Sequence, residues 1–379
     1  MKKLLIVLAV LLLAAPTMAA EWNFYGSARL ATFSTDIDMD VPGQDSDRDT
    51  LWDDPGNSRI GANVKFNDQI SGKFEYGSAS SINKRQLFGK YNFGVGELLV
   101  GQTYTPTSEY FYSTSVYATD NNLFGIGQFY AGRQPMLRLK FGELKLAFVK
   151  PNTVDYDVVK AVGPYTLNAT KGTIDPTVKA VAADTDVTFP KVELSYGYKG
   201  EMFFVDVFGG YQTTEYENPD GGGSEDIDAY VVGIGAGVTV GPVWFNAGFH
   251  MGQNLGNYGN VNGAFIFDDK SLFLTKAVAS YDAVTGEFLD LEDQDGLGYL
   301  AVLGFQANDM LTFEAGYGRQ ETEIDEYEAD VTQYYLLANI QIAKGVYVVP
   351  EIGMFKYSED GVSEEPDALY MGAKWQINF

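Results

Sequence analysis

The sequence predicts an all-β protein, a transmembrane antiparallel β-barrel of about sixteen strands. Three observations lead to this fold class. Apolar and polar residues alternate along most of the chain, the gaps between these stretches are short and long in turn, and the apolar face of each stretch carries almost no charge. Hydrophobic residues make up 45% of the chain and aromatic residues 14%, which argues against a disordered protein.

The segment from residue 230 to 249 illustrates the alternation. It carries no charge, but its many glycines and Pro242 would each destabilise a helix. Its apolar side chains instead alternate with small ones on both sides of Gly241 and Pro242. A β-hairpin therefore explains this segment, and no other segment beyond the N-terminus is apolar over the length that a transmembrane helix needs.

The same two-residue period predicts the remaining strands. Alternation alone also fits a water-soluble sandwich, in which one face of each sheet meets solvent. The predicted strands cover residues 22–33, 58–67, 71–80, 85–93, 97–104, 135–141, 143–149, 191–198, 202–213, 228–240, 243–252, 296–307, 311–321, 331–342, 346–358 and 367–379.

The connections between the strands favour the membrane barrel. Some are tight turns, and others are long, such as 34–57, 105–134, 150–190 and 253–295. Most of the 51 acidic side chains lie in the long segments. Short turns at one end and long loops at the other are typical of bacterial outer-membrane barrels, and closing the sheet pairs every backbone group in lipid.

The N-terminus has the pattern of an export signal. Lys2 and Lys3 precede an apolar run that ends before Pro16, and small side chains follow up to Ala20. We expect residues 1–20 to be a cleaved signal peptide and residues 21–379 to form one outer-membrane barrel domain. An uncleaved membrane anchor is the alternative, but the apolar run is short for a span.

The composition excludes several classes of site. The chain has no Cys and one His, and its net charge is −25. We therefore expect no cofactor, no structural metal and no nucleic-acid partner. Two hypotheses stay open: calcium binding by the aspartates from Asp36 to Asp49, against a simple solvated loop, and a catalytic role for His250, against ordinary polar lining.

Several short motifs resemble those of the general diffusion porins of Gram-negative outer membranes. They are Phe24-Tyr25-Gly26, the stretch 85–89 with Phe93-Gly94, the stretch 101–106, and the final segment 370–379. The chain departs from the family pattern at Gln102, where an Arg is common. The resemblance implies a homotrimer whose third extracellular loop, at about residues 105–134, folds into the channel. It also implies an assembly signal in the last strand, here Trp375, Ile377 and Phe379.

Strand parity places basic side chains on the inner wall, mostly in the first half of the barrel. Glu109 and Asp120 on the third loop would face this basic wall and form the loop side of the constriction. Opposed cations and anions would then orient polar solutes. The predicted basic wall consists of Arg29, Arg59, Lys65, Lys73, Arg138, Lys140 and Lys145, with Arg85 added from the family likeness.

The expected function is passive diffusion of ions and small hydrophilic solutes through a water-filled channel in the bacterial outer membrane, without enzymatic activity. Acidic loops at the mouth predict a modest cation preference, countered by the basic wall. The alternatives are a substrate-specific channel for a sugar or similar solute, an outer-membrane hydrolase and a structural barrel. The expected partners are membrane lipid, lipopolysaccharide, the barrel-assembly machinery and the transported solutes.

Overall fold

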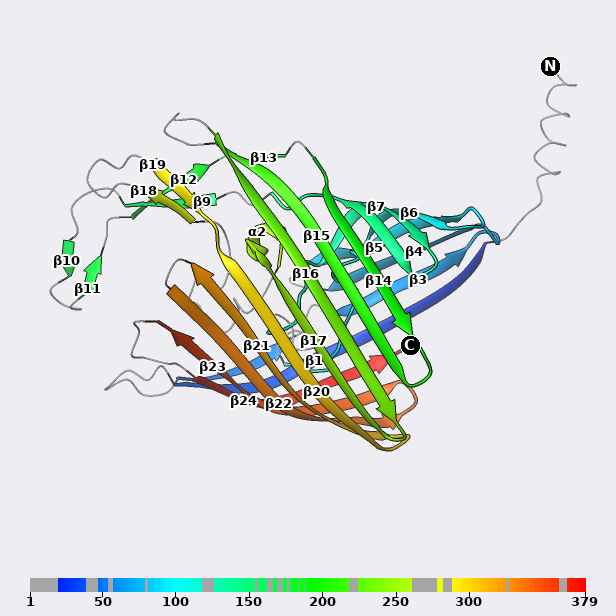
Figure 1. Cartoon of the computed structure of the whole chain (residues 1–379). Helices are drawn as coiled ribbons and strands as arrows, with labels where there is room; N and C mark the ends of the chain where they lie inside the picture. The colour runs from blue at the N-terminus through cyan, green and yellow to red at the C-terminus, as the bar shows by residue number, and fades with distance from the viewer. Residues whose placement is uncertain are drawn as a thin grey trace, which may run out of the picture.

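The described part of the protein is a closed antiparallel barrel of sixteen strands (Figure 1). The computed structural model describes residues 20–38, 47–53, 57–78, 81–117, 126–153, 156–161, 166–168, 173–175, 178–183, 185–187, 189–217, 224–260, 278–281, 288–324, 327–360 and 367–379. Each barrel strand pairs with its neighbours in the chain, so the fold class predicted from the sequence is confirmed.

The strands of the first half of the barrel after β1 are shorter than those of the second half. Strands β3 to β8 have 6 to 11 residues, whereas the barrel strands from β15 to β24 have 11 to 17. The strands are β1 (Glu21–Asp38), β2 (Asp47–Asp53), β3 (Ser58–Lys65), β4 (Ile70–Ser78), β5 (Ile82–Asn92), β6 (Glu97–Tyr104), β7 (Arg133–Phe141), β8 (Leu144–Val149), β13 (Thr185–Asp186), β14 (Lys191–Lys199), β15 (Phe203–Glu217), β16 (Ser224–Val240), β17 (Val243–Gln253), β20 (Asp295–Asn308), β21 (Leu311–Ile324), β22 (Tyr327–Ala343), β23 (Val346–Glu359) and β24 (Asp367–Asn378).

The sheet contains eighteen strand segments, but β2 with β3 and β13 with β14 each share one position in the barrel, so the barrel has sixteen strands. β3 pairs with the first part of β1 and β2 with its last part, so β2 and β3 together serve as one strand beside β1. β13 pairs with β15 beyond the end of β14. These extensions lie on the side of the long loops, where the strands rise beyond the predicted ends.

The two faces of β16 show why alternation produces a membrane barrel. Val232 and Ile234 are exposed on the outside, whereas Val231 and Gly235 are buried on the inside. The outer surface therefore offers apolar side chains to lipid, while the inner face is free to carry polar groups.

The barrel closes through an antiparallel pairing of its first and last strands. The register runs from Ser27 opposite Asn378 to Asp38 opposite Asp367. Gly26 and Phe379 exchange two further backbone hydrogen bonds of 2.7 and 3.0 Å. No edge of the sheet is left unpaired at this seam, as a lipid environment requires.

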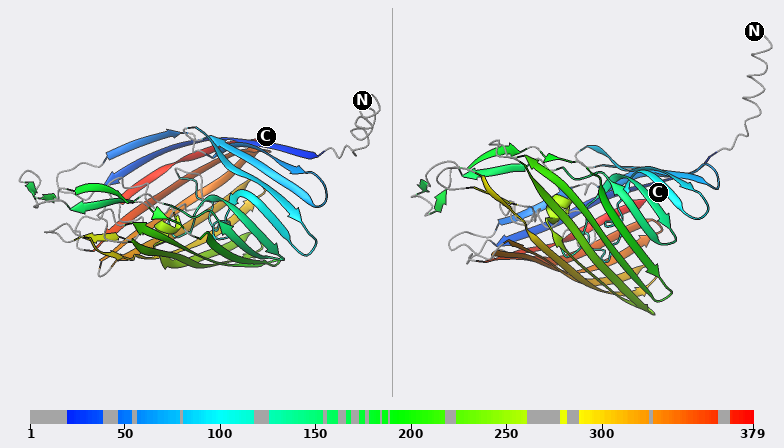
Figure 2. Two further views of the ribbon diagram at one scale, coloured as in Figure 1. Left: turned by 90° about the horizontal axis from the view of Figure 1, so that it is seen from above. Right: turned by 45° about the horizontal axis from the view of Figure 1, so that its top comes forward.

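The long connections contain short strands at positions that were predicted to be loops. β9 (Tyr156–Ala161) pairs with β12 (Val178–Ala183), β10 (Thr166–Asn168) with β11 (Thr173–Asp175), and β18 (Val278–Tyr281) with β19 (Phe288–Glu292). Figure 2 shows these hairpins beyond one end of the barrel, opposite the tight turns. The described residues also form one short helix, α2 (Leu255–Tyr258), and include no helix long and apolar enough to span a membrane.

Gly372 offers a test of the closing seam. A Cβ atom at this position would overlap the backbone of β1, lying 2.6 Å from the Phe33 Cα. We expect Gly372→Ala to destabilise the barrel by about 1–3 kcal/mol, the usual effect of overpacking. Reversible urea unfolding in lipid vesicles, followed by tryptophan fluorescence, measures this. Gly89→Ala is the control, because a Cβ there has nothing within 4 Å. Equal stability of the two variants would contradict the prediction.

Candidate functional site: the inward loop and the channel chamber

The connection between β6 and β7 is called here the inward loop (residues 105–132). Its described residues, 105–117 and 126–132, lie inside the barrel. Its first arm leaves β6, passes β8, β15 and β17, and reaches β22, β23 and finally β1. The contacts that mark this path are Glu109 with Lys145, Tyr110 with Phe208, Tyr112 with Asn246, Ser113 with Tyr335, Val116 with Glu351, and Tyr117 with Thr35. The predicted insertion of the third loop is therefore confirmed over its described residues.

Buried wall carboxylates hold the first arm. Glu193 accepts hydrogen bonds from the backbone N–H and the hydroxyl of Thr107, both at 3.0 Å. Glu314 accepts the N–H of Thr114 at 2.7 Å, and Glu351 accepts the N–H of Val116 at 2.6 Å. Hydrogen bonds contribute about 0.5–1.5 kcal/mol each between neutral groups and about 1.5–3 kcal/mol each when the acceptor is charged. A polar loop thus replaces its water shell with carboxylate oxygens supplied by the wall.

Aromatic packing holds the far end of the first arm and also the return arm of the loop. Tyr117 lies against Phe355 and Tyr370, with ring centroids 5.5 and 4.0 Å away. On the return arm, Phe129 packs edge-on against His250 at 5.5 Å. Burial raises the pKa of Tyr130 on the same arm to about 12, because the buried site disfavours the charged phenolate.

The inward loop contacts the inner wall from β8 round to β23, and Tyr117 at the end of its first arm also reaches Thr35 on β1 and Tyr370 on β24. Parts of β1, β3, β22, β23 and β24 remain in contact with open space. Between the loop and these strands lies a cavity of about 440 Å³, called here the chamber. Three of its lining side chains are cationic, and none of them is acidic. The chamber is lined by Arg29, Arg59, Tyr104, Phe111, Thr114, Val116, Asn339, Tyr347, Val349, Lys374, Gln376 and Asn378.

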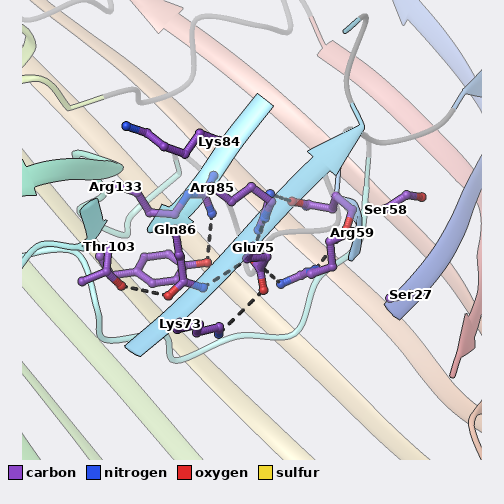
Figure 3. A network of polar contacts seen from close by, with 12 residues as sticks. Ser27, Ser58, Arg59, Lys73, Glu75, Lys84, Arg85, Gln86, Thr103 and Arg133 are labelled. Atoms are coloured by element: carbon purple, nitrogen blue, oxygen red, sulfur yellow. Dashed lines mark hydrogen bonds and ion pairs between the residues drawn. The ribbon is translucent and has the colours of Figure 1, made fainter. Parts of the chain in front are cut away.

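A buried carboxylate organises the bases beside the chamber (Figure 3). The Oε1 atom of Glu75 lies 2.8 Å from the Nε atom of Arg85 and 3.7 Å from the Nη1 atom of Arg59. Its Oε2 atom lies 3.7 Å from the Nζ atom of Lys73 and accepts a 2.8 Å hydrogen bond from the Tyr25 hydroxyl. One acid is thus shared by three bases, and the cluster keeps an excess of positive charge.

A β-bulge explains why Arg85, which was added to the basic wall from the family likeness, lies in the lumen. Glu75 pairs with Gln86 and Tyr76 pairs with Lys84, so Arg85 is the extra residue in β5. Both Arg85 and Gln86 are buried, and both donate to Glu75. The bulge directs two consecutive side chains into the lumen, which regular alternation forbids.

The other predicted basic residues lie away from the chamber. Glu109 pairs with Lys145 and lies 3.7 Å from Arg138, so this loop carboxylate faces β7 and β8 rather than the chamber. Near the short turns, Lys65 pairs with Asp68 at 2.8 Å and Lys140 with Glu143 at 3.3 Å. Asp120 lies outside the described residues.

The structure also describes the predicted assembly signal, the candidate catalytic His250 and part of the aspartate-rich segment. Trp375 and Ile377 on β24 and Phe379 directly after it are exposed, at 47%, 53% and 73% of their surface. His250 is fully buried on the inner wall under the return arm. Asp36 pairs with Arg48 at 2.7 Å, while Asp40 and Asp45 lie outside the described residues.

Four residues that line the chamber, organise its bases or hold the inward loop were not predicted from the sequence. Lys374 shares a strand face with Tyr370 and Gln376, so its parity already predicted an inward position. Glu75 lies two residues from Lys73 and shares its face in the same way. Glu314 and Glu351 carry no local signal, because their partners are 200 and 235 residues away in the loop.

Comparisons with solved structures show the same architecture. The outer membrane channel DcaP of Acinetobacter baumannii is similar with a TM-score of 0.62 at 15% identity, over 95% of this chain and 98% of that one. OmpT, an outer-membrane protein of Vibrio cholerae, has a TM-score of 0.56 at 14% identity, over 94% and 98%. The anion-selective porin from Comamonas acidovorans has a TM-score of 0.56 at 11% identity, over 94% and 100%.

These identities are low, so the structural likeness shows the fold alone. No curated protein is similar enough in sequence to count as a relative. A family model described as Gram-negative porin matches residues 6–360, which is nearly the full length of the chain. The chain therefore belongs to the Gram-negative porin family and forms a channel in the outer membrane.

Proposed function

We propose that the protein is a passive, water-filled channel for ions and small hydrophilic solutes. The inward loop carries this proposal, because it fills one side of the lumen and leaves a polar chamber against β1, β3 and β24. Pore width, lining polarity and local charge then decide what passes. Passive diffusion along a gradient requires no energy source.

The charge of the chamber opposes that of the mouth. Acidic loops predict a modest cation preference, since they concentrate cations at the entrance. The chamber, in contrast, is lined by Arg29, Arg59 and Lys374 without an acidic side chain. We propose that the chamber discriminates more strongly than the mouth, because a solute in the chamber lies close to its three bases, whereas salt screens the acids of the outer loops. Small anions are therefore the favoured solutes of the channel, in place of the cations that the loops suggest.

A substrate-specific channel is the second candidate. Tyr104, Phe111 and Tyr347 line the chamber together with its three bases. Tyr104 and Phe111 meet edge to face, with centroids 5.5 Å apart and an interplanar angle of 82°. Rings in this geometry offer one stacking surface and do not form a continuous row of rings along which a sugar could move. General diffusion therefore remains our leading proposal.

The proposal also covers export and assembly. Residues 1–20 act as a cleaved signal peptide, and Trp375, Ile377 and Phe379 serve as the signal for the barrel-assembly machinery. A structural neighbour from Vibrio cholerae is described as a trimer form, and the present chain is proposed to form a homotrimer among outer-membrane lipid and lipopolysaccharide.

The selectivity of the chamber is testable by charge removal. We expect the double variant Arg59→Gln, Lys374→Gln to shift the reversal potential under a salt gradient towards cations, because two of three lining cations are lost. Planar-bilayer recordings measure this shift. Lys140→Gln is the matched control, since Lys140 pairs with Glu143 outside the chamber. Cation selectivity of the parent channel, or equal shifts in both variants, would refute the assignment.

The two candidate functions differ in how solutes affect the ion current. For general diffusion we expect a disaccharide to reduce the current in proportion to its concentration, without saturation. Titration of the sugar against the single-channel current measures this. Saturable block that disappears in Phe111→Ala but persists in Tyr91→Ala, on the outside of the barrel, would instead favour the substrate-specific channel.

A further inference from the structure

Tyr112 lies at the middle of the first arm of the inward loop, where the loop crosses from β15 towards β21. Its backbone N–H donates to the Oε1 atom of Gln128 on the return arm at 3.3 Å. Its carbonyl oxygen accepts a 3.0 Å hydrogen bond from the Nδ2 atom of Asn246 on β17. The two arms of the loop and the barrel wall therefore meet at this one residue.

The ring of Tyr112 fits a flat place in the wall made by two glycines, called here the glycine notch. Gly235 on β16 and Gly248 on β17 are directly paired across the two strands. A Cβ atom on Gly248 would lie 2.7 Å from the Cδ2 atom of Tyr112, and one on Gly235 would overlap the phenol end of the ring. Any larger side chain at either position would occupy the space of the ring.

A second ring fixes the orientation of Tyr112. Phe204 on β15 stacks on it with centroids 6.0 Å apart and an interplanar angle of 4°. Phe204 in turn lies over Gly237, whose Cβ would overlap its ring. The wall therefore offers Tyr112 a floor of glycine backbone and a parallel aromatic neighbour, and only 5% of its surface remains exposed.

The hydroxyl of Tyr112 contributes no specific contact to this arrangement. Its oxygen is buried and has no hydrogen-bond partner among the described residues. The fit of the ring to the glycine notch depends on shape alone. Phenylalanine is expected to serve equally well.

The neighbours of Tyr112 face the other way. Phe111 and Thr114 line the chamber, opposite Arg29, Arg59 and Lys374. Because Tyr112 points into the wall, the depth of its ring fixes how far Phe111 and Thr114 stand from the basic side chains across the chamber.

We infer that Tyr112 and the glycine notch set the position of the inward loop and thereby the width of the channel. This inference rests on the proposed function as a channel. Tyr112 is a positioning residue, since it acts on passing solutes through Phe111 and Thr114 rather than by contact.

Filling the glycine notch tests the inference. We expect Gly235→Ala to push the ring towards the chamber and lower both the single-channel conductance and the size cut-off for neutral polyethylene glycols. Gly235→Val should lower them further, because it adds more volume beneath the ring. Gly89→Ala, at a strand position with nothing within 4 Å, should match the parent channel.

Removing the ring gives the reciprocal test. Tyr112→Ala lets the loop settle towards β16 and β17, so the conductance should rise, whereas Tyr112→Phe should leave it unchanged. In the double variant Gly235→Val, Tyr112→Ala the valine no longer meets a ring. Its conductance should therefore equal that of Tyr112→Ala, which is the non-additivity expected of residues in contact.

The outcomes separate the inference from the proposed function. Absence of conductance in the folded parent protein would overturn the proposed function. Alternatively, the parent conducts, and Gly235→Val and Tyr112→Ala have the same conductance and size cut-off as the parent. That result would overturn the inference and leave the proposed function intact. If Gly235→Val fails to fold, as judged by heat-modifiable electrophoresis, Tyr112→Ala against Tyr112→Phe decides the question, since equal conductance in these two variants refutes the positioning role.

Discussion

The rest of the structure depends on one constraint: within lipid, each backbone N–H and C=O must find its partner inside the protein. The pairing of β1 with β24 meets this constraint along twelve residue pairs and with the terminal bonds between Gly26 and Phe379. Closure leaves a lumen wide enough for an aqueous channel at sixteen strands. The function then depends on what the chain places inside that lumen.

The inward loop is held by the wall without cations of its own. Glu193, Glu314 and Glu351 accept hydrogen bonds from its backbone and hydroxyl groups, and aromatic rings fill the spaces beside inner-wall glycines. All these contacts lie on β14 to β23, where most strands have 11 to 17 residues. The chamber remains beside the loop, where the basic side chains of β1, β3 and β24 line it together with residues of β22 and β23.

Strands were predictable from the sequence because lipid on one side and water on the other impose a period of two. The prediction of 243–252 compares with Val243–Gln253 in the structure. It was too short for β1, predicted as 22–33 but observed as Glu21–Asp38, because the outward positions above the membrane become polar. The contacts of Glu193 and Glu351 with the loop were not predictable, since they join residues 86 and 235 positions apart. Arg85 escaped the parity rule through a bulge.

The net charge of −25 is a poor guide to the field inside the channel, because two acids beside its basic side chains are already engaged. Glu75 is shared among Arg59, Lys73 and Arg85, and Glu109 pairs with Lys145. The acids of the outer loops act from a distance: Asp36 is seven residues from Arg29 along β1, about 23 Å at the rise of a strand. The Debye length in physiological salt is about 8 Å, so their potential is largely screened before it reaches the chamber. This screening supports the proposal that local bases, rather than the total charge, decide which ions the chamber favours.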